Sequence, residues 1–304
     1  MESGQLPMSA LPGGFDLQST LESGQSYLWW RADGGDYDDE PPYGGDAWYC
    51  TTTRATGEPA AVRVRQRDGV IEWESTVDAE PVLRDRLRLD DDLDAIRAAT
   101  PDDPLIEASF DAYRGMRLVR DPPFASLISF ICSAQMRVSR IHAMQQSLRE
   151  AFGDPIAVDG ETYHAYPTPE RLAAASEAAL RDLSLGYRAP YVKRTAEMVA
   201  DGNDPGAMGG EPYEAARESL TRYVGVGEKV ADCVLLFSLG YLQAVPLDTW
   251  IRKTIGEYYP DCDRGNYADT SQAIRERLGG EYAGYAQTYV FHHLRHGGEV
   301  EQRA

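Results

Sequence analysis

Hydrophobic and polar residues follow two different periods along the chain. In residues 62–65 and 71–74, apolar residues alternate one by one with charged ones, a period of two that is typical of half-buried β-strands. The dipeptide Asp68-Gly69 separates the two runs and favours a tight hairpin turn. Residues before about 78 therefore predict an antiparallel sheet, with an acidic, Gly- and Pro-rich surface loop at residues 32–46.

From about Glu80 onward the apolar residues follow the period of a helix, and Gly, Pro and Asp residues interrupt the runs as helix ends require. The predicted helices cover residues 124–134, 138–152, 190–200, 213–223, 228–239, 249–259 and 282–296. The pattern predicts the α+β class. An N-terminal antiparallel β-sheet domain, residues 1–79, precedes a mostly α-helical domain, residues 80–304.

Residues 218–240 predict two helices joined by a tight hairpin. The first helix ends near Tyr223, and the second begins near Glu228. Gly225 and Gly227 between them permit a positive φ or a close approach of the backbone. The amide groups at such a helix N-terminus bind phosphate without any lysine. A plain helix–turn–helix corner is the alternative that the two glycines alone leave open.

Two residues near this hairpin suit chemistry on a nucleotide. Lys229 falls in the first turn of the second helix. There, partial burial and the positive helix end are expected to lower its pKa and leave a neutral amine that can attack carbon. Asp248 precedes another predicted helix, where an N-cap is the common role of Asp. A carboxylate at that position can equally stabilise positive charge that develops on a sugar ring.

The hairpin with Lys229, followed by Val-Pro-Leu-Asp at residues 245–248, resembles the helix-hairpin-helix GPD superfamily of DNA glycosylases, and specifically its 8-oxoguanine DNA glycosylase family. Four further segments, in the family's order, carry the resemblance over most of the chain. They are Glu-Ser-Gly-Gln-Ser-Tyr at residues 22–27, the stretch at residues 117–133, Leu-Gly-Tyr-Arg-Ala-Pro-Tyr at residues 185–191, and Gly-Tyr-Ala-Gln at residues 284–287 with Phe291.

The resemblance implies a bifunctional DNA glycosylase and AP lyase that excises 8-oxoguanine, preferentially opposite cytosine, from duplex DNA in base excision repair. Lys229 would form a Schiff base with C1′ of the damaged nucleotide, and Asp248 would stabilise the oxocarbenium-like transition state. A monofunctional alkyl-base glycosylase shares the fold and the Asp but normally lacks the Lys. A non-enzymatic hairpin DNA-binding protein would leave both residues without a purpose.

The resemblance also implies a pocket for the flipped base. Cys233 and Phe291 would sandwich the base, and Gln287 would contact its Watson–Crick edge. The carbonyl of Gly24 would accept the N7–H that 8-oxoguanine has and guanine lacks. Cys233 lies one helical turn beyond Lys229, so both side chains share a face.

On the opposite strand, Arg140 and Arg188 would read the orphaned cytosine, and Tyr187 would be wedged near the gap. Two positions depart from the family pattern. Gln135 stands where the family fills the vacated space with Asn, so we expect a relaxed choice of opposite base. Trp250 stands where the family often has a phosphate-binding His, so phosphate binding there weakens or changes character.

The charge of the chain first argues against a nucleic acid partner. With 49 acidic and 30 basic residues, the formal net charge is −19, which gives no long-range attraction to phosphate. Lysine is confined to Lys193, Lys229 and Lys253, while Asp is spread through the loops. At molar salt the Debye length falls to roughly 3 Å, which screens the repulsion. We therefore interpret the acidity as a halophilic adaptation, typical of a high-salt prokaryotic cytoplasm.

Other expectations follow from what the chain lacks. The sequence has no stretch apolar and long enough for a bilayer and no basic-then-apolar leader, so we expect a cytoplasmic protein without membrane contact. The scattered Cys50, Cys132, Cys233 and Cys262 exclude the cysteine cluster of an iron–sulfur centre. We expect a monomer that binds double-stranded DNA containing oxidised guanine and needs no cofactor. The sequence leaves open whether the backbone carbonyls of the hairpin bind a monovalent or divalent cation.

Overall fold

The structure, a computed structural model, describes residues 1–35 and 46–298. The acidic loop predicted at residues 32–46 therefore lies mostly outside the described residues. Within the described part of the chain, no helix is both long and apolar enough to cross a membrane.

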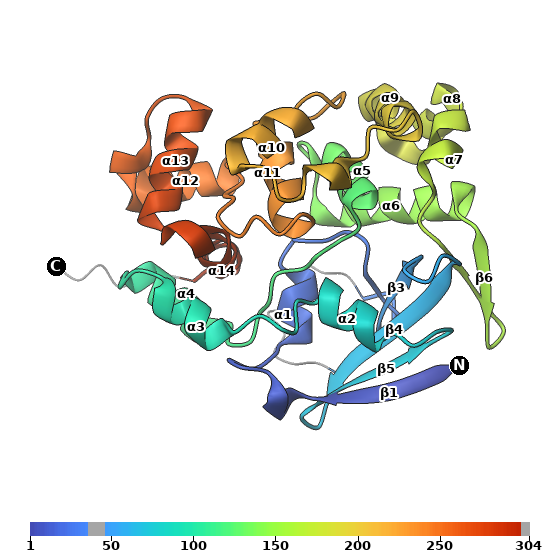
Figure 1. The fold of residues 1–304 in the computed structure, drawn as a ribbon, viewed down its shortest axis with the longest axis horizontal. Helices are drawn as coiled ribbons and strands as arrows, with labels where there is room; N and C mark the ends of the chain where they lie inside the picture. Colours follow the sequence, from blue (N-terminus) through green and yellow to red (C-terminus); the bar gives the residue numbers. More distant parts are fainter. Residues whose placement is uncertain (36–45, 299–304) are drawn as a thin grey trace.

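The N-terminal region forms a five-stranded antiparallel sheet with the strand order β1-β5-β4-β3-β2 (Figure 1). Its strands are β1 (Glu2–Pro7), β2 (Trp30–Arg31), β3 (Tyr49–Thr53), β4 (Ala60–Arg67) and β5 (Val70–Ser75). The predicted hairpin joins β4 to β5, and φ is positive at both Asp68 and Gly69, as a type I′ turn requires.

The described residues form fourteen α-helices, of which seven match the predicted ranges with ends that differ by a few residues and seven lie outside those ranges. The helices are α1 (Leu17–Glu22), α2 (Glu80–Arg86), α3 (Leu93–Ala99), α4 (Pro104–Ala112), α5 (Pro123–Ser133), α6 (Val138–Phe152), α7 (Pro169–Ala174), α8 (Glu177–Leu180), α9 (Ala189–Ala200), α10 (Tyr213–Leu220), α11 (Glu228–Phe237), α12 (Thr249–Tyr258), α13 (Tyr267–Arg277) and α14 (Ala283–Arg295). The predicted α+β class is confirmed.

Two elements differ in type from the region of the prediction in which they lie. Helix α1 lies inside the region expected to be all strand. Its polar residues are buried together with its two leucines, and a segment of six residues is too short to show a helical period. The small hairpin of β6 (Pro155–Val158) and β7 (Glu161–His164) has strands too short to show alternation. Its turn at Asp159 and Gly160 has positive φ at both residues, and that dipeptide was the one available signal.

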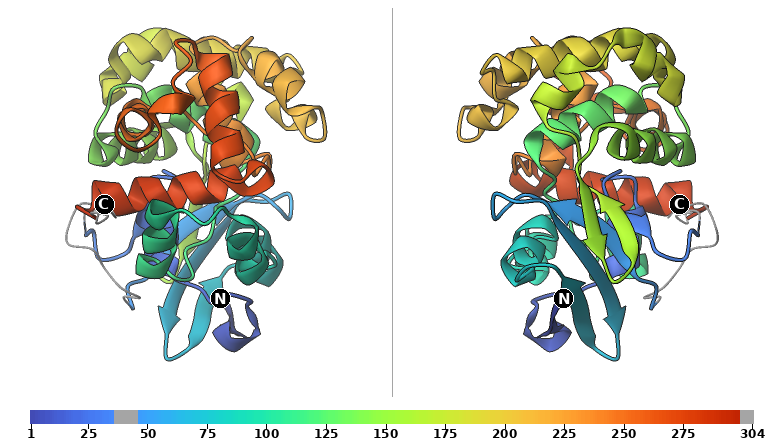
Figure 2. Two further views of the ribbon diagram at one scale, coloured as in Figure 1. Left: turned by 90° about the vertical axis from the view of Figure 1, so that its left-hand side faces the viewer. Right: turned by 90° about the vertical axis from the view of Figure 1, so that its right-hand side faces the viewer.

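The sheet and the helices share a continuous hydrophobic core. After the last strand of the five-stranded sheet, the next helix, α2, begins at Glu80. A single cluster of buried apolar residues nevertheless runs from Leu6 in β1 to Val290 in α14. Helix α14, drawn in red-orange, passes between the sheet and the upper helices (Figure 2). The two regions therefore pack as one body, with α14 at their junction.

An extended segment, residues 116–121, fastens these parts together. The Nε2 of Gln25 donates to the carbonyl of Arg117 (2.9 Å), and the amide of Val119 donates to the Oε1 of Gln25 (3.1 Å). On the other side, the amide of Asp121 donates to the carbonyl of Phe237 at the end of α11 (2.8 Å). The segment thus connects the loop after α1 with the helix that carries Lys229.

Buried side chains complete the attachment. The carboxylate of Asp121 accepts from the guanidinium of Arg86 (2.9 Å) and from the hydroxyl of Ser26 (2.5 Å). The fully buried Arg117 donates to backbone carbonyls of four residues in other loops: Pro12, Gly14, Arg88 and Asp91. Each buried donor or acceptor that loses its partner costs about 1–3 kcal/mol. These contacts therefore restrict how the sheet and the helices can pack against each other.

Helix α11 also holds α10 and α13 through one buried carboxylate. Asp232 is fully buried and accepts hydrogen bonds from the hydroxyls of Tyr213 (2.6 Å) and Tyr267 (2.7 Å). Burial raises the pKa of Asp232 to about 6, although these hydrogen bonds and the nearby Arg217 act to lower it. The folded protein therefore binds this proton more tightly than the unfolded chain, whose Asp has a pKa of about 3.9.

Because the folded-state pKa of Asp232 is raised, its contribution to stability falls as pH rises from about 4 to 6 and stays low above that range. We expect wild-type protein to gain about 1 kcal/mol relative to Asp232→Asn when the pH falls from about 7 to about 5. Urea unfolding of both proteins at both pH values, in one high-salt buffer, measures this difference. Parallel pH dependence of the two proteins would show that Asp232 is already ionised below pH 5.

Candidate active site

The predicted helical hairpin is present, between α10 and α11. Gly225 has a φ of +84°, and a Cβ added to it would lie 2.9 Å from carbons of the Tyr191 side chain, so both conformation and space require glycine. Gly227 differs from the expectation of a positive φ or a close contact. Its φ is −95°, and it is the N-cap of α11. Apart from neighbouring backbone, no atom of the described residues lies within 4 Å of the position of a Cβ.

A cavity of about 650 Å³ opens beside the hairpin. Seven predicted site residues line it: Gly24, Gln135, Lys229, Cys233, Asp248, Gln287 and Phe291. They come from the loop after α1, the turn after α5, and helices α11, α12 and α14. The other predicted residues, Arg140, Tyr187, Arg188, Gly225 and Gly227, lie outside the lining.

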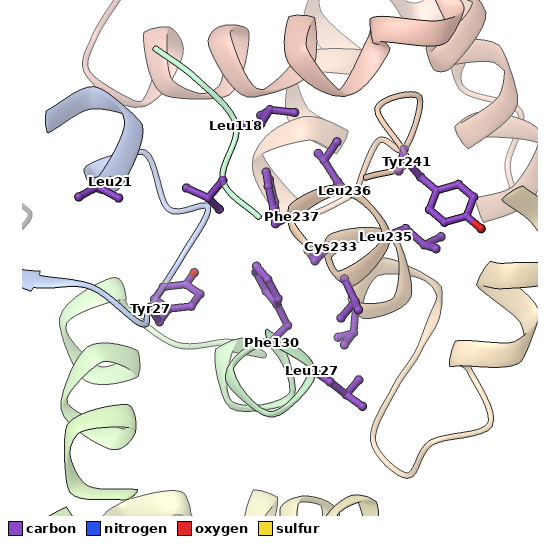
Figure 3. Packing of buried hydrophobic residues seen from close by; sticks show 14 of the residues in the cluster. Leu21, Tyr27, Leu118, Leu127, Phe130, Cys233, Leu235, Leu236, Phe237 and Tyr241 are labelled. Atoms are coloured by element: carbon purple, nitrogen blue, oxygen red, sulfur yellow. The ribbon is translucent and has the colours of Figure 1, made fainter. Parts of the chain in front are cut away.

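Lys229 is half-buried in the first turn of α11. Its Nζ lies 5.7 Å from the ring centroid of Phe130 in α5, and its side chain is within hydrogen-bonding reach of the Cys233 thiol. Figure 3 shows Tyr27, Phe130 and Cys233 directed towards one another from the α1 loop, α5 and α11. The predicted shared face of Lys229 and Cys233 is therefore confirmed.

The expected fall in the pKa of Lys229 is wrong. Burial by itself lowers this pKa, but the neighbouring Cys233, Tyr27 and Asp248 raise it by more, so it lies above the ordinary value of lysine. Burial raises the pKa of Cys233 to about 11 and that of Tyr27 to about 12, so both are neutral near pH 7. Near pH 7 the carboxylate of Asp248 is thus the charged neighbour that favours the protonated form of Lys229.

Asp248 is at once a helix cap and part of the cavity wall. Its Oδ1 accepts from the amide of Ile251 (2.8 Å), which caps α12. Burial raises the pKa of this carboxyl, whereas the backbone amides and Lys229 act to lower it. The two interpretations of Asp248 left open by the sequence are therefore compatible.

Two walls of the cavity supply polar groups for a planar ligand. Gln287 in α14 is buried, and its Oε1 accepts no hydrogen bond from any described residue. Gly24 has a φ of +83°, and a Cβ there would lie 3.8 Å from Phe291 and 3.6 Å from Arg295. Those contacts are ordinary, so the positive φ, and not crowding, is what requires glycine at this position.

The turn after α5 borders the cavity mouth. Gln135 is exposed and has a φ of +56°, a left-handed conformation that Asn tolerates better than Gln. Arg188 is buried beneath this turn and donates to the carbonyl of Ala134. Its guanidinium also lies 4.3 Å from the ring centroid of Tyr187, which is exposed. Arg140 is exposed in the first turn of α6.

Comparison with known proteins places this arrangement in a family. A model of the HhH-GPD superfamily of base excision DNA repair proteins matches residues 128–279. The chain is also 32% identical to a probable N-glycosylase/DNA lyase of Methanothermobacter thermautotrophicus, over 95% of this chain and 96% of that protein. The chain belongs to the HhH-GPD superfamily of base excision DNA repair proteins.

Solved structures of the superfamily agree over nearly the whole chain. A structure of MBOgg1 in complex with a low-affinity DNA ligand has a TM-score of 0.82 and 26% identity, covering 98% of this chain and all of that one (100%). A Clostridium acetobutylicum 8-oxoguanine glycosylase/lyase, bound to double-stranded DNA with cytosine opposite 8-oxoguanine, has a TM-score of 0.80 and 26% identity. It covers 93% of this chain and 92% of that one. The family resemblance drawn from the motifs is confirmed.

Around the HhH-GPD hairpin and cavity, the distribution of charge differs from the rest of the protein. Most arginines of the described residues lie within 4.0 Å of a carboxylate, as in the pairs of Arg65 with Glu72 and of Arg120 with Asp85. By contrast, no carboxylate in the described part of the chain is that close to any of four cations near the cavity. They are Arg137, Arg140, Arg252 and Lys253. An acidic protein thus keeps unpaired positive charge at this face.

Three residues of the cavity wall, Tyr27, Phe130 and Arg252, were given no role by the sequence analysis, although Tyr27 and Phe130 lie in segments that carry the family resemblance. Tyr27 and Phe130 pack edge to face with centroids 5.7 Å apart and form the floor beside Lys229. In the sequence Phe130 is one apolar residue of a helical run. Arg252 lines the cavity one helical turn beyond Asp248, and that spacing was the one available clue. Among residues 1–35 and 46–298, no three His, Cys, Asp or Glu side chains cluster as metal ligands.

The two hairpin glycines provide a matched pair of substitutions. We expect Gly225→Ala to lower the free energy of unfolding by about 2 kcal/mol, because a left-handed residue with a side chain costs about 1–2 kcal/mol and Tyr191 must also move. Gly227→Ala should stay within about 0.5 kcal/mol of wild type, because its φ suits alanine and its surroundings are open. Urea unfolding of the three proteins compares them. Equal losses in both variants would contradict the hairpin geometry.

Proposed function

We propose that this protein is a bifunctional DNA N-glycosylase and AP lyase that removes 8-oxoguanine from duplex DNA in base excision repair. The observation that carries the proposal is the convergence of an amine, Lys229, and a carboxylate, Asp248, on one cavity. That cavity also contains Gln287, with an unused buried acceptor, and the apolar faces of Cys233 and Phe291. The names of the relatives, N-glycosylase/DNA lyase and 8-oxoguanine glycosylase/lyase, support the same class.

In the proposed reaction, the Nζ lone pair of Lys229 forms a bond to C1′ of the flipped nucleotide while the bond from C1′ to the base nitrogen breaks. The bonding electrons leave with the base, which then takes a proton. Positive charge develops on the sugar before the new bond is complete, and the carboxylate of Asp248 stabilises it. Loss of such an electrostatic contribution typically costs about 3–4 kcal/mol of transition-state stabilisation.

Lys229 must first lose a proton, because Asp248 holds it as an ammonium in the free protein. Once attached to C1′, the nitrogen gives one proton to the ring oxygen and forms a double bond to C1′ as the C1′–O bond breaks. The products are a protonated Schiff base and a free 4′-hydroxyl. The imine acidifies the C2′–H, and loss of this proton expels the 3′-phosphate by elimination. This second stage is the lyase step, and it requires an amine nucleophile where a monofunctional enzyme needs only a carboxylate.

Recognition of the damaged base is proposed to rest on one backbone group. The carbonyl of Gly24 accepts the N7–H of 8-oxoguanine, and the positive φ of Gly24 orients that carbonyl. A single hydrogen bond contributes about 1 kcal/mol net, and the repulsion between this carbonyl and the bare N7 of guanine adds to the discrimination. Gln287 contacts the Watson–Crick edge of the base through its free Oε1, and Cys233 and Phe291 cover its two faces.

The unpaired cations and the hairpin amides are proposed to bind the duplex. Helix α11 has no side chain capping its N-terminus, so its first amides are available to a phosphate. Arg137 and Arg140 add charge beside the cavity mouth. Tyr187 is exposed, and its proposed role is to enter the gap in the duplex. Arg188 would have to leave the carbonyl of Ala134 to reach a cytosine. We propose a monomer that works in a high-salt cytoplasm without a cofactor. The proposal does not depend on whether the hairpin carbonyls bind a cation.

Borohydride trapping tests the nucleophile. We expect Lys229→Gln to abolish both covalent trapping on 8-oxoguanine duplex and base release, because the amine is lost while most of the side-chain volume is kept. The matched control is Lys193→Gln, since Lys193 donates to the carbonyls of Ala173 and Ala175 and does not line the cavity. This control should still be trapped. Trapping that persists in Lys229→Gln would move the nucleophile elsewhere. Base release without trapping in wild type would identify a monofunctional enzyme. If wild type shows neither base release nor trapping, the protein is a DNA-binding protein without this activity.

The choice of opposite base tests Gln135. Arg140 and Arg188 favour cytosine, whose O2 and N3 accept hydrogen bonds, whereas the longer Gln135 adapts to other bases. We expect Gln135→Asn to sharpen the preference for cytosine. Residue 135 has a left-handed φ of +56°, which Asn should adopt without loss of stability. Single-turnover release from 8-oxoguanine opposite each of the four bases measures this. An unchanged preference in the variant would mean that Gln135 does not set it.

A further inference from the structure

Trp250 is an exposed tryptophan at the mouth of the cavity. Its side chain is 44% exposed, and it lines the cavity as the second residue of α12. By contrast, Trp29 and Trp73 are buried, and Trp48 lies under the guanidinium groups of arginines on the sheet. A large apolar ring left in water beside a reactive cavity indicates that something covers it when the site is in use.

The first turn of α12 does not suit a phosphate. The carboxylate of Asp248 already accepts from the amides of Trp250 and Ile251, so these N–H groups are occupied. A negative charge at this helix start also repels a phosphate. The indole ring of Trp250 therefore offers a flat apolar face to an approaching ligand, and its one hydrogen-bond donor, Nε1–H, lies at the edge of the ring.

Positive charge surrounds this surface. The Nζ of Lys253 lies 5.8 Å from the centroid of the Trp250 ring, and Arg252 lines the cavity next to it. Neither Lys253 nor Arg252 has a carboxylate of the described residues within 4.0 Å. An aromatic face flanked by free cations is the arrangement with which proteins stack nucleic acid bases while tracking the backbone.

We propose that Trp250 stacks on a nucleotide that neighbours the extruded one on the same strand. The inference rests on the proposed function, because Asp248, two residues earlier, is the carboxylate assigned to the sugar of the extruded nucleotide. Because Trp250 and Asp248 line the same cavity, the ring of Trp250 then meets the adjoining part of that strand. The neighbouring base, unstacked when the damaged base leaves the helix, regains a stacking partner.

Stacking on Trp250 also solves a problem that the composition creates. Contacts between cations and phosphates weaken as salt rises, because binding releases counterions, whereas stacking of a base on a neutral ring releases none. A chain with a net charge of −19 has no long-range attraction to DNA, and its few contacts between unpaired cations and phosphate weaken at high salt. Trp250 supplies affinity that salt does not remove, at the position where the strand must be held.

Binding measured across a range of salt separates the two kinds of contact. The probe is a duplex that carries a tetrahydrofuran abasic analogue, titrated with protein from about 0.1 to about 1 M KCl. We expect Trp250→Ala to lose about tenfold in affinity at every salt concentration, which corresponds to about 1.4 kcal/mol, and to keep the wild-type salt slope. Trp250→Phe should retain most of the affinity, and Trp250→Leu should resemble Ala, because leucine has no π-face.

Lys253→Ala is the comparison for an ionic contact and should flatten the salt slope by about one phosphate equivalent. Tryptophan fluorescence gives a direct signal, since DNA should quench wild type and Trp48→Phe equally but leave Trp250→Phe unquenched. A 2-aminopurine placed 5′ or 3′ of the lesion then identifies the stacked neighbour. Three outcomes would overturn the inference. They are wild-type affinity in Trp250→Ala, wild-type affinity in Trp250→Leu, and a salt slope in either variant that differs from that of wild type.

The proposed function fails separately. If wild-type protein neither releases 8-oxoguanine nor becomes trapped, the proposed enzyme activity is wrong, whatever Trp250 does in binding. If wild type is active and trapped while every Trp250 variant binds like wild type, the stacking role alone is wrong. Because Trp250 is exposed, its substitutions should leave the unfolding midpoint unchanged, which a urea titration checks.

Discussion

The relative position of the cavity walls depends on buried hydrogen bonds to one extended segment, residues 116–121. Gln25 bonds to this segment in both directions, the amide of Asp121 donates to the end of α11, and the hydroxyl of Tyr289 in α14 donates to the carbonyl of Met116 (2.5 Å). The loop with Gly24, the helix with Lys229 and the helix with Gln287 and Phe291 are therefore all attached to the same backbone. A shift of any one wall would leave buried polar groups without partners, which costs more than the net gain of any single hydrogen bond.

The acidity of the chain and its place in a DNA repair superfamily are reconciled by where the charges are paired. On the sheet and outer helices, arginines are neutralised by neighbouring carboxylates, as in Arg63 with Glu74. Beside the cavity, Arg137, Arg140, Arg252 and Lys253 have no such partner among the described residues. Net charge describes solubility and long-range attraction, whereas binding at short range depends on which charges are free. A chain can thus be strongly acidic and still present a locally positive face.

The pKa of Lys229 shows how a site differs from the sum of its sequence signals. A helix N-terminus and partial burial both predict a lowered pKa, and burial does act in that direction. Cys233, Tyr27 and Asp248 meet Lys229 in the fold, and together they outweigh burial and raise its pKa. The carboxylate that is proposed to stabilise the transition state also holds the nucleophile in its resting, protonated form. The two proposed catalytic groups are therefore coupled, and neither can be understood from its local sequence.

By itself, the sequence determined the sheet-then-helix order, the β4–β5 hairpin, the helical hairpin and the family, because each depends on local period, turn residues or motif spacing. It also named seven residues that line the cavity. Only the tertiary structure decided the helical state of the wholly buried α1, the sign of the pKa shift at Lys229, the burial of Arg188 beneath the turn of Gln135, and the parts of Tyr27 and Phe130 in the cavity. These properties depend on which distant groups meet and on how much water they exclude, and neither quantity is periodic along the chain.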